Sequence, residues 1–229
     1  MAYPFKSWLT LIPITLLHGR RPLFKIAKAT NGAIHEAAKI IMNGGLVVYP
    51  TDTVYGLGCD PLNIQSVRLL MKAKSRDGKP LPILASSIKK AEKVAYFNKN
   101  ASKIARKFWP GAVTLVLRKK PLISTTVTCG SRSIGVRVPK DDVALKLIRL
   151  SGGFIIGTSA NITGRKSPRT AIEAANQVGK YVDLILDAGP TNIGEDSTVI
   201  DVTSERPQIL RAGPIKVRDI AKTLRVKLT

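Results

Sequence analysis

Segments with the apolar spacing of a helix alternate along this chain with short apolar runs, and this alternation constrains the fold more than any other feature. From Asn31 to Asn43 apolar residues recur every three or four positions, and Gly44 and Gly45 then end the predicted helix. Residues 46–49 form an apolar run that predicts a buried strand ending at Pro50. The same succession continues to the C-terminus, which is typical of an α/β fold.

The remaining elements follow from the same periodicity. Further helices are predicted over residues 64–74, within 88–108, and over 143–150, 171–178 and 215–224. Further strands are predicted over 81–84, 113–117, 134–138, 154–157, 183–186, 198–202 and 208–210. Several gaps between successive strands are too short for a helix, so the sheet must be mixed and not purely parallel.

We expect a single folded unit after a short extension. No linker, repeat or low-complexity segment interrupts the chain after Thr30. This predicts an N-terminal extension over residues 1–28 and one three-layer α/β domain over 29–229. The segment before Glu36 has cations but no Asp or Glu, a pattern that an organellar transit peptide would share. A plain extension ahead of the domain is the better explanation.

The composition limits the partners and the compartment. The 229 residues contain 37 Lys and Arg against 15 Asp and Glu, a formal net charge of +22. That charge favours polyanionic partners such as RNA, DNA or nucleotide phosphates. Two cysteines, Cys59 and Cys129, are too few for a disulfide framework or a zinc site, and no apolar run is long enough to span a bilayer. We therefore expect a soluble, cytoplasmic protein with no membrane partner.

Four clusters of hydroxyl, amide and cationic residues lie at the ends of predicted elements. They cover residues 50–58, 72–80, 157–164 and, as one cluster in two parts, 196–201 and 209–214. In the second cluster Lys74 and Arg76 alternate, so in an extended segment both side chains point to one side, an arrangement that suits phosphate. In the fourth, Arg211 leaves a strand just before a helix start, where anions are favoured. Ordinary turns or solvated charge runs explain each cluster taken alone.

The residues that are missing narrow the chemistry. Both histidines, His18 and His35, lie in or beside the extension, which argues against a catalytic triad or a histidine metal site. No Walker-type glycine loop is present. A site made of hydroxyls, amides and cations favours catalysis by positioning and electrostatic stabilisation, as in phosphoryl and nucleotidyl transfer.

In their order along the chain, these clusters resemble the YrdC-like family of L-threonylcarbamoyl-AMP synthases, in its short form without the extra C-terminal domain of longer members. The matching pieces are GGLVVYPTDTVYGLG at 44–58, Lys74-x-Arg76, WPGAVTL at 109–115, GVRVP at 135–139, Ser159-x-Asn161, STV at 197–199 and LRAG at 210–213. The resemblance implies a twisted, open mixed sheet flanked by helices, with a concave basic cavity.

The resemblance also implies a nucleotidyltransferase reaction. L-threonine, bicarbonate or CO2, and ATP carrying Mg²⁺ would give threonylcarbamoyl-AMP and pyrophosphate. A separate threonylcarbamoyl transferase would then use the product for tRNA N6-threonylcarbamoyladenosine modification. Since Mg²⁺ would arrive on ATP, no protein ligand for a metal is expected.

Site residues are carried over only at matching positions. The resemblance assigns a catalytic role to Lys74 and Arg76. It places ATP at Arg76, Lys79, Thr114, Asn161, Arg169 and Arg211, and L-threonine at Thr53, Arg118, Ser159 and Ser197. Leu84 stands where many members have a histidine that contacts threonine, which leaves the amino-acid selectivity open.

Two other functions compete with this reading. Lysine-rich predicted helices and a basic C-terminal segment favour a non-enzymatic module that binds tRNA or double-stranded RNA, although aromatic residues make up only 5% and no RNA-binding signature is present. An enzyme that binds RNA weakly is compatible with the same charge. A carbamoyl-transfer relative acting on carbamoyl phosphate is the third possibility, but the acyl-phosphatase and zinc-finger segments of such proteins are absent from the sequence.

Overall fold

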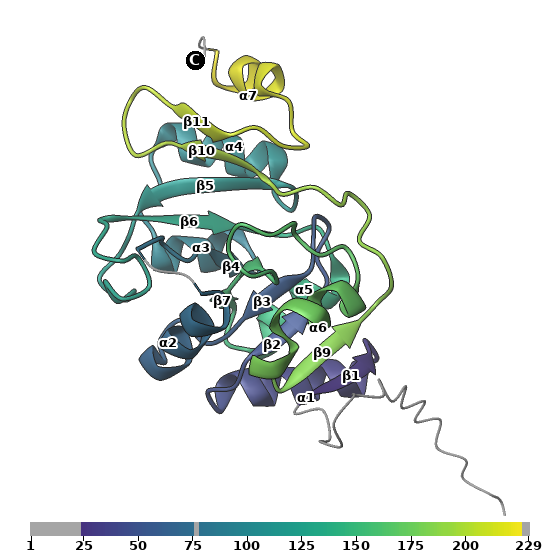
Figure 1. Cartoon of the computed structure of the whole chain (residues 1–229). Coiled ribbons are helices and arrows are strands. Elements are labelled where there is room, and N and C mark those ends of the chain that lie inside the picture. Colours follow the sequence, from purple (N-terminus) through teal and green to yellow (C-terminus); the bar gives the residue numbers. More distant parts are fainter. Residues whose placement is uncertain (1–23, 76–77, 226–229) are drawn as a thin grey trace, which may run out of the picture.

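The computed structural model describes residues 24–75 and 78–225, in which the strands form two mixed sheets (Figure 1). The five-stranded sheet contains, in spatial order, β1 (Lys25–Lys28), β9 (Leu184–Asp187), β2 (Val47–Tyr49), β3 (Gly56–Gly58) and β8 (Thr158–Ser159). The first three of these strands are parallel, and each of the last two is antiparallel to its preceding neighbour.

The other sheet has six strands. In spatial order it contains β11 (Gln208–Arg211), β10 (Thr198–Asp201), β5 (Val113–Arg118), β6 (Ser133–Arg137), β4 (Ile83–Ala85) and β7 (Phe154–Ile156). The pairs β10–β5 and β6–β4 are parallel and the other neighbours are antiparallel.

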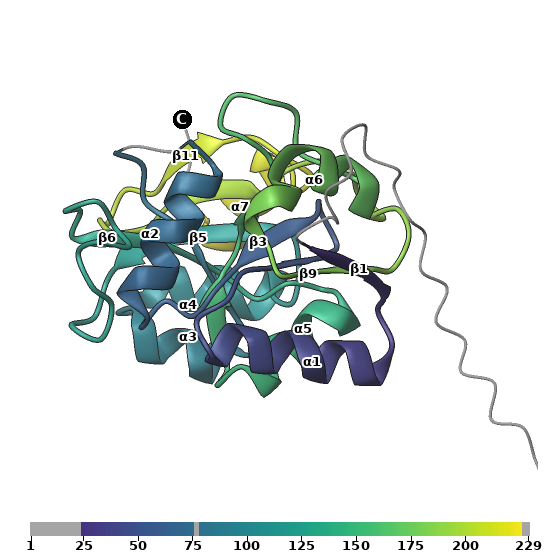
Figure 2. The same ribbon diagram turned by 60° about the horizontal axis from the view of Figure 1, so that its bottom comes forward.

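Helices cover both faces of the five-stranded sheet (Figure 2). Val47 and Tyr49 of β2 pack with α1 (Asn31–Met42) and α5 (Asp142–Leu150). Val48, whose side chain points the opposite way, joins the core that includes α2 (Ile64–Ala73) and α6 (Ala171–Val178). A 3-10 turn, η1 (Gly179–Tyr181), follows α6. This part of the molecule is the three-layer arrangement that the alternating sequence predicts.

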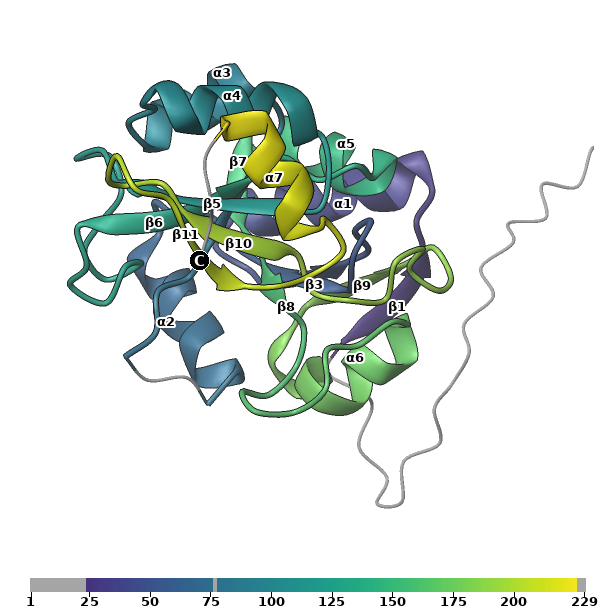
Figure 3. The same cartoon turned by 90° about the horizontal axis from the view of Figure 1, so that it is seen from above.

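The six-stranded sheet has helices over one face, namely α3 (Ile88–Val94), α4 (Lys99–Phe108) and α7 (Val217–Leu224) (Figure 3). In β5, Leu115 and Leu117 belong to the core under these helices. Thr114 and Val116, which alternate with them, point to the opposite face and line a cavity there. The period-2 pattern of one strand therefore separates the core from the site.

Local capping explains where most helices begin. Helices α1 to α6 each follow a residue whose side chain accepts a hydrogen bond from a backbone N–H of the first turn: Thr30, Asn63, Ser87, Asn98, Asp141 and Thr170. Within the described residues, no helix combines the length and apolar character needed to traverse a bilayer.

The predicted mixed α/β fold is confirmed, with three additions. Each predicted helix and strand is present within a few residues of its expected bounds, but β1, β3 and β8 were not predicted. β3 contains two glycines and β8 only two residues, so neither has a readable apolar pattern. Because β1 pairs with β9, the sheet already includes Lys25–Lys28, ahead of the predicted domain start at residue 29. Residues 1–23 of the predicted extension lie outside the described residues.

The strands are divided between two sheets because one segment passes from one to the other. β7 pairs with β4 in the six-stranded sheet, and β8, two residues later, pairs with β3 in the five-stranded sheet. Gly157 lies between them, and a Cβ there would overlap the side chain of Leu84. A close backbone approach at the change of sheet therefore requires glycine.

Candidate functional site

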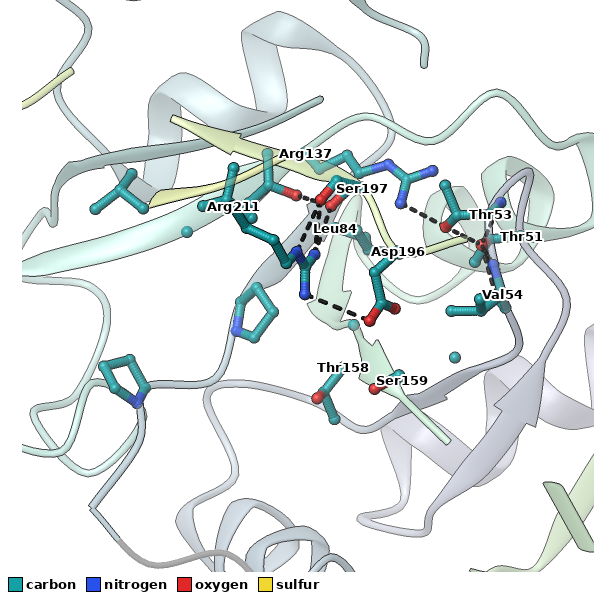
Figure 4. A pocket seen from close by; sticks show the side chains of 18 residues that line it. Thr51, Thr53, Val54, Leu84, Arg137, Thr158, Ser159, Asp196, Ser197 and Arg211 are labelled. Atoms are coloured by element: carbon teal, nitrogen blue, oxygen red, sulfur yellow. Dashed lines mark hydrogen bonds and ion pairs between the residues drawn. The ribbon is translucent and has the colours of Figure 1, made fainter. Parts of the chain in front are cut away.

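A cavity of about 260 Å³ is lined by residues from both sheets (Figure 4). The turn between β2 and β3 and strand β8 contribute from the five-stranded sheet. The uncovered faces of β5, β6 and β10 contribute from the six-stranded sheet, together with the end of β11. Hydroxyl groups dominate the polar lining, and the cations Arg137 and Arg211 lie on the side of the six-stranded sheet.

Arg211 is held at the rim of this cavity by Ser197. Its Nε and Nη2 atoms donate to the Ser197 carbonyl at 3.0 and 2.8 Å, and Nη2 also donates to the Ser197 hydroxyl at 3.2 Å. That hydroxyl lies 2.7 Å from Oγ1 of Thr114. A Cβ at Gly213 would come within 2.6 Å of the Thr198 backbone nitrogen, which explains the glycine two residues after Arg211.

An acidic side chain shares the cavity with Arg211. The Asp196 carboxylate lies 3.5 Å from Nη1 of Arg211 and accepts hydrogen bonds from the Ser167 hydroxyl at 3.1 and 3.2 Å. The side chains of both Asp196 and Arg211 remain partly exposed, so solvent screens this pair. An anionic ligand that enters the cavity can therefore displace this carboxylate from the guanidinium of Arg211.

Arg137 is buried in the wall of the cavity. Its Nη1 donates to Oγ1 of Thr53 at 2.8 Å, its Nε donates to the Gly111 carbonyl at 2.9 Å, and its Nη2 donates to the Asp52 carboxylate. Burial lowers the pKa of Arg137, and the adjacent Asp52 opposes that shift. The pair joins the end of β6 to the turn after β2.

Lys74 lies behind the loop that follows β8, at the C-terminal end of α2. Its ammonium donates to the carbonyls of Ser159 and Asn161 at 2.5 and 2.8 Å and to Oδ1 of Asn161 at 3.2 Å. Oδ1 of Asn161 also accepts from the Ser159 hydroxyl at 2.6 Å. The buried ammonium thus holds the loop that presents Ser159 to the cavity.

The structure places the predicted site residues in three groups. Those that line the cavity are Thr53, Thr114, Ser159, Ser197 and Arg211, and Leu84 lines it with them. Lys74 and Asn161 are buried next to it, behind Ser159. Three others, Lys79, Arg118 and Arg169, are exposed and do not line the cavity. The remaining one, Arg76, lies outside the described residues.

Sequence reasoning missed three charged residues of the cavity region: Arg137, Asp52 and Asp196. Arg137 carried a readable signal, because it is a cation inside an apolar predicted strand, and such a residue needs a buried partner. That partner, Asp52, lies 85 residues earlier in the chain within the cluster at 50–58, where no local pattern links it to Arg137. Among the described residues, no three or more His, Cys, Asp or Glu side chains are grouped so as to hold a metal.

Comparisons with known proteins agree on one family. The model of the Sua5/YciO/YrdC family, described as telomere recombination, matches residues 39–213. A threonylcarbamoyl-AMP synthase of Pyrococcus abyssi is 40% identical over 193 residues, which are 83% of this chain and 57% of that protein. A threonylcarbamoyl-AMP synthase of Idiomarina loihiensis is 38% identical over 170 residues, 69% of this chain and 90% of that protein.

A solved structure supports the same assignment. The crystal structure of P. abyssi Sua5 complexed with L-threonine superposes with a TM-score of 0.84 at 37% identity, over 89% of this chain and 61% of that one. The chain therefore spans less than two thirds of the Pyrococcus protein, although it spans nine tenths of the Idiomarina protein.

Proposed function

This chain belongs to the Sua5/YciO/YrdC family, and we propose that it is an L-threonylcarbamoyladenylate synthase. Its substrates are L-threonine, bicarbonate or CO2, and ATP, and its products are threonylcarbamoyl-AMP and pyrophosphate. The observation that carries the proposal is the cavity, where hydroxyl groups from the five-stranded sheet face an arginine held at the edge of the six-stranded sheet. Hydroxyls suit the polar groups of an amino acid, and the arginine suits a phosphate.

The reaction joins an amine, a carbon and a phosphorus in two steps. The threonine amine adds CO2 and loses a proton to form a carbamate; when bicarbonate is the source, water is released. A carbamate oxygen then attacks the α-phosphorus, and the bond from this phosphorus to the bridging oxygen of pyrophosphate breaks. Because negative charge gathers on phosphate oxygens in the second step, fixed cations lower its barrier.

The roles of the residues follow from their positions. We assign Thr53, Ser159 and Ser197 to L-threonine, and Thr114 and Arg211 to ATP, because all five line the cavity. Lys74 remains a proposed catalytic residue from the family resemblance, and its ammonium also holds the loop that carries Ser159 and Asn161. Arg76, Lys79, Asn161 and Arg169 remain proposed ATP contacts and Arg118 a proposed threonine contact, all from the family resemblance alone.

We propose that Mg²⁺ enters as part of the ATP substrate. The cavity has one carboxylate among its described lining residues, that of Asp196, which is already paired with Arg211 and Ser167. A single carboxylate suits a cation that keeps most of its ligands from water and phosphate, as Mg²⁺ does on a nucleotide.

The decisive experiment supplies each substrate separately. The protein is mixed with ATP, Mg²⁺ and bicarbonate and with L-threonine, L-serine or L-valine in turn, while pyrophosphate release and the adenylate mass are followed. We expect release that requires both bicarbonate and L-threonine. L-valine matches threonine in shape but lacks the hydroxyl, so it serves as the matched control. Release with carbamoyl phosphate in place of bicarbonate and amino acid would instead favour the carbamoyl-transfer alternative.

We also propose that the enzyme binds tRNA or double-stranded RNA weakly and passes its product to a separate threonylcarbamoyl transferase. The support for RNA binding is a basic surface on α4 and α7, which pack together. Its exposed cations are Lys99, Lys103, Arg106, Lys107, Lys216, Arg218, Lys222 and Arg225. This basic surface lies on the face of the six-stranded sheet opposite the cavity, so RNA and substrates would not compete for space.

A further inference from the structure

We propose that Arg137 is a positioning residue for the amino-acid substrate. Held by Asp52, it fixes the Thr53 hydroxyl so that this hydroxyl presents a hydrogen-bond acceptor to the cavity. The inference rests on the proposed function, because it concerns how the synthase orients its amino acid. It adds a role for two residues, Arg137 and Asp52, which the proposed roles above leave unused.

Arg137 lines the cavity, yet its hydrogen bonds are directed into the protein. Three nitrogens of its side chain donate to Thr53, Gly111 and Asp52, and the side chain is only 6% exposed. The negative charge of Asp52 balances the guanidinium within the wall. This sets Arg137 apart from Arg211, whose carboxylate partner is partly solvated. Arg137 therefore supports the wall and does not serve as a phosphate contact.

Figure 4 shows the contact of Arg137 with Thr53 and the contacts of Thr53 with Thr51, and the donor and acceptor chemistry of these groups sets the direction of each hydrogen bond. A guanidinium can only donate, so the 2.8 Å contact makes Thr53 Oγ1 an acceptor. A carbonyl can only accept, so Thr51 gives its one hydroxyl hydrogen to the Val54 carbonyl at 2.7 Å. The two threonine hydroxyls lie 3.0 Å apart, and Thr51 has no hydrogen left for that contact. Thr53 must therefore donate to Thr51.

The backbone of the same turn keeps Thr51 in this role. The N–H groups of Thr53 and Val54 point at Oγ1 of Thr51, at 3.1 and 3.3 Å. Because this oxygen has two lone pairs, the two neighbouring N–H groups must share one of them and leave the other for the Thr53 hydroxyl, while its own hydrogen stays on the Val54 carbonyl. The direction of this series of hydrogen bonds is thus set at one end by Arg137 and at the other by the backbone of the turn.

This direction determines which group a ligand can place against Thr53. A hydroxyl has one hydrogen and two acceptor lone pairs. On Thr53 the hydrogen goes to Thr51 and one lone pair receives Arg137, so the second lone pair is what remains for the cavity. It accepts an N–H or O–H of an amino acid and repels carboxylate or phosphate oxygens. Through Thr53, Arg137 thereby favours the donor groups of the amino acid in one part of the cavity, while Arg211 favours phosphate in another.

The test is a double-mutant cycle between Arg137 and Thr53, measured by steady-state kinetics of threonine-dependent pyrophosphate release. Arg137→Lys keeps a positive charge beside Asp52 but loses the planar fork that reaches three acceptors. Thr53→Val removes the hydroxyl and keeps the shape. We expect each single variant to raise the KM for L-threonine about tenfold, the loss of one charged hydrogen bond, with little change in the KM for ATP. Arg149→Lys, the same exchange on the exposed face of α5, is the matched control.

The double variant shows whether Arg137 acts through Thr53. If Arg137 acts through Thr53, then Arg137→Lys has little further effect once Thr53 is valine, and the two losses do not add. Additive losses, an unchanged KM for L-threonine in Arg137→Lys, or an equal rise in the KM for ATP would overturn the inference. Should Arg137→Lys fail to fold, Asp52→Asn replaces it in the same cycle with the same expectations. An inactive wild type would count against the proposed function, whereas an active wild type with additive variants counts against Arg137 alone.

Discussion

Lys74 and Arg211 are both cations of the proposed site, but because their surroundings differ, substituting them should change the stability of the fold by different amounts. Lys74 is buried, and its ammonium satisfies two carbonyls of the loop that presents Ser159. The Arg211 side chain is 47% exposed and lies at the rim. A buried charged donor contributes to folding, while a rim cation has little effect on stability and is free to act on a substrate.

Exchanging each cation for a neutral side chain of similar length tests this difference. We expect Lys74→Met to lower the free energy of unfolding by about 3 kcal/mol, because it leaves buried carbonyls without a donor, and to reduce turnover as well. Arg211→Gln is expected to leave stability within about 1 kcal/mol and to cut turnover about a hundredfold. Denaturant unfolding and pyrophosphate release measure the two effects separately. A stable Lys74→Met protein would contradict the buried role, and normal turnover in Arg211→Gln would remove that residue from the reaction.

At the scale of elements, the passage from β7 to β8 connects the fold to the site. The segment leaves the six-stranded sheet and enters the five-stranded sheet across Gly157, and Leu84 of β4 packs against that glycine. Leu84 also lines the cavity. A change in the size of residue 157 must therefore be felt both in the packing of the two sheets and in the cavity.

We expect Gly157→Ala to lower the free energy of unfolding by about 2 kcal/mol, because the new methyl group overlaps Leu84 and the core must shift. The displaced leucine should also raise the KM for L-threonine. Gly32→Ala on α1 is the matched control: a Cβ there meets nothing within 4 Å, and alanine favours the helix. Thermal unfolding of the two variants should shift in opposite directions, and equal stabilities would refute the packing argument.

For the molecule as a whole, the distribution of charge matters more than its total. Four of the cations behind the formal charge of +22 lie on α4, which has no acidic residue. This helix packs on α7. Since this surface lies on the far side of the six-stranded sheet from the cavity, RNA binding and catalysis are expected to be separable.

RNA affinity should therefore fall at least tenfold between about 50 and 200 mM salt, because phosphate contacts release counterions. Lys103→Glu with Arg106→Glu on α4 should weaken binding to double-stranded RNA further while pyrophosphate release stays normal. Lys39→Glu with Lys28→Glu makes the same change of charge near the other sheet and should affect binding less. Fluorescence anisotropy at several salt concentrations measures each affinity. Salt-independent binding, or an equal loss in both double variants, would contradict a localised basic surface.

The local features of the chain were readable without coordinates. A helix begins after a capping residue that bonds to its first turn, as Asn98 does for α4, and a strand forms from an apolar run. Both are local patterns that the sequence shows. The ordered motifs likewise predicted that Thr53, Thr114, Ser159, Ser197 and Arg211 belong to one site, and these five do line one cavity.

Tertiary structure decided the direction in which the polar side chains point. The sequence assigned Lys74 to the site, but only the structure shows that its ammonium donates to the Ser159 loop, which lies 85 residues later in the chain. Arg137 acquires its position from Thr53 and Asp52, 84 and 85 residues away. Such contacts depend on how strands pair across two sheets, and pairing is a long-range property that no local pattern encodes. The sequence thus determines the helices and strands through local patterns. The partners and directions of the polar side chains in the cavity are set only when the two sheets come together.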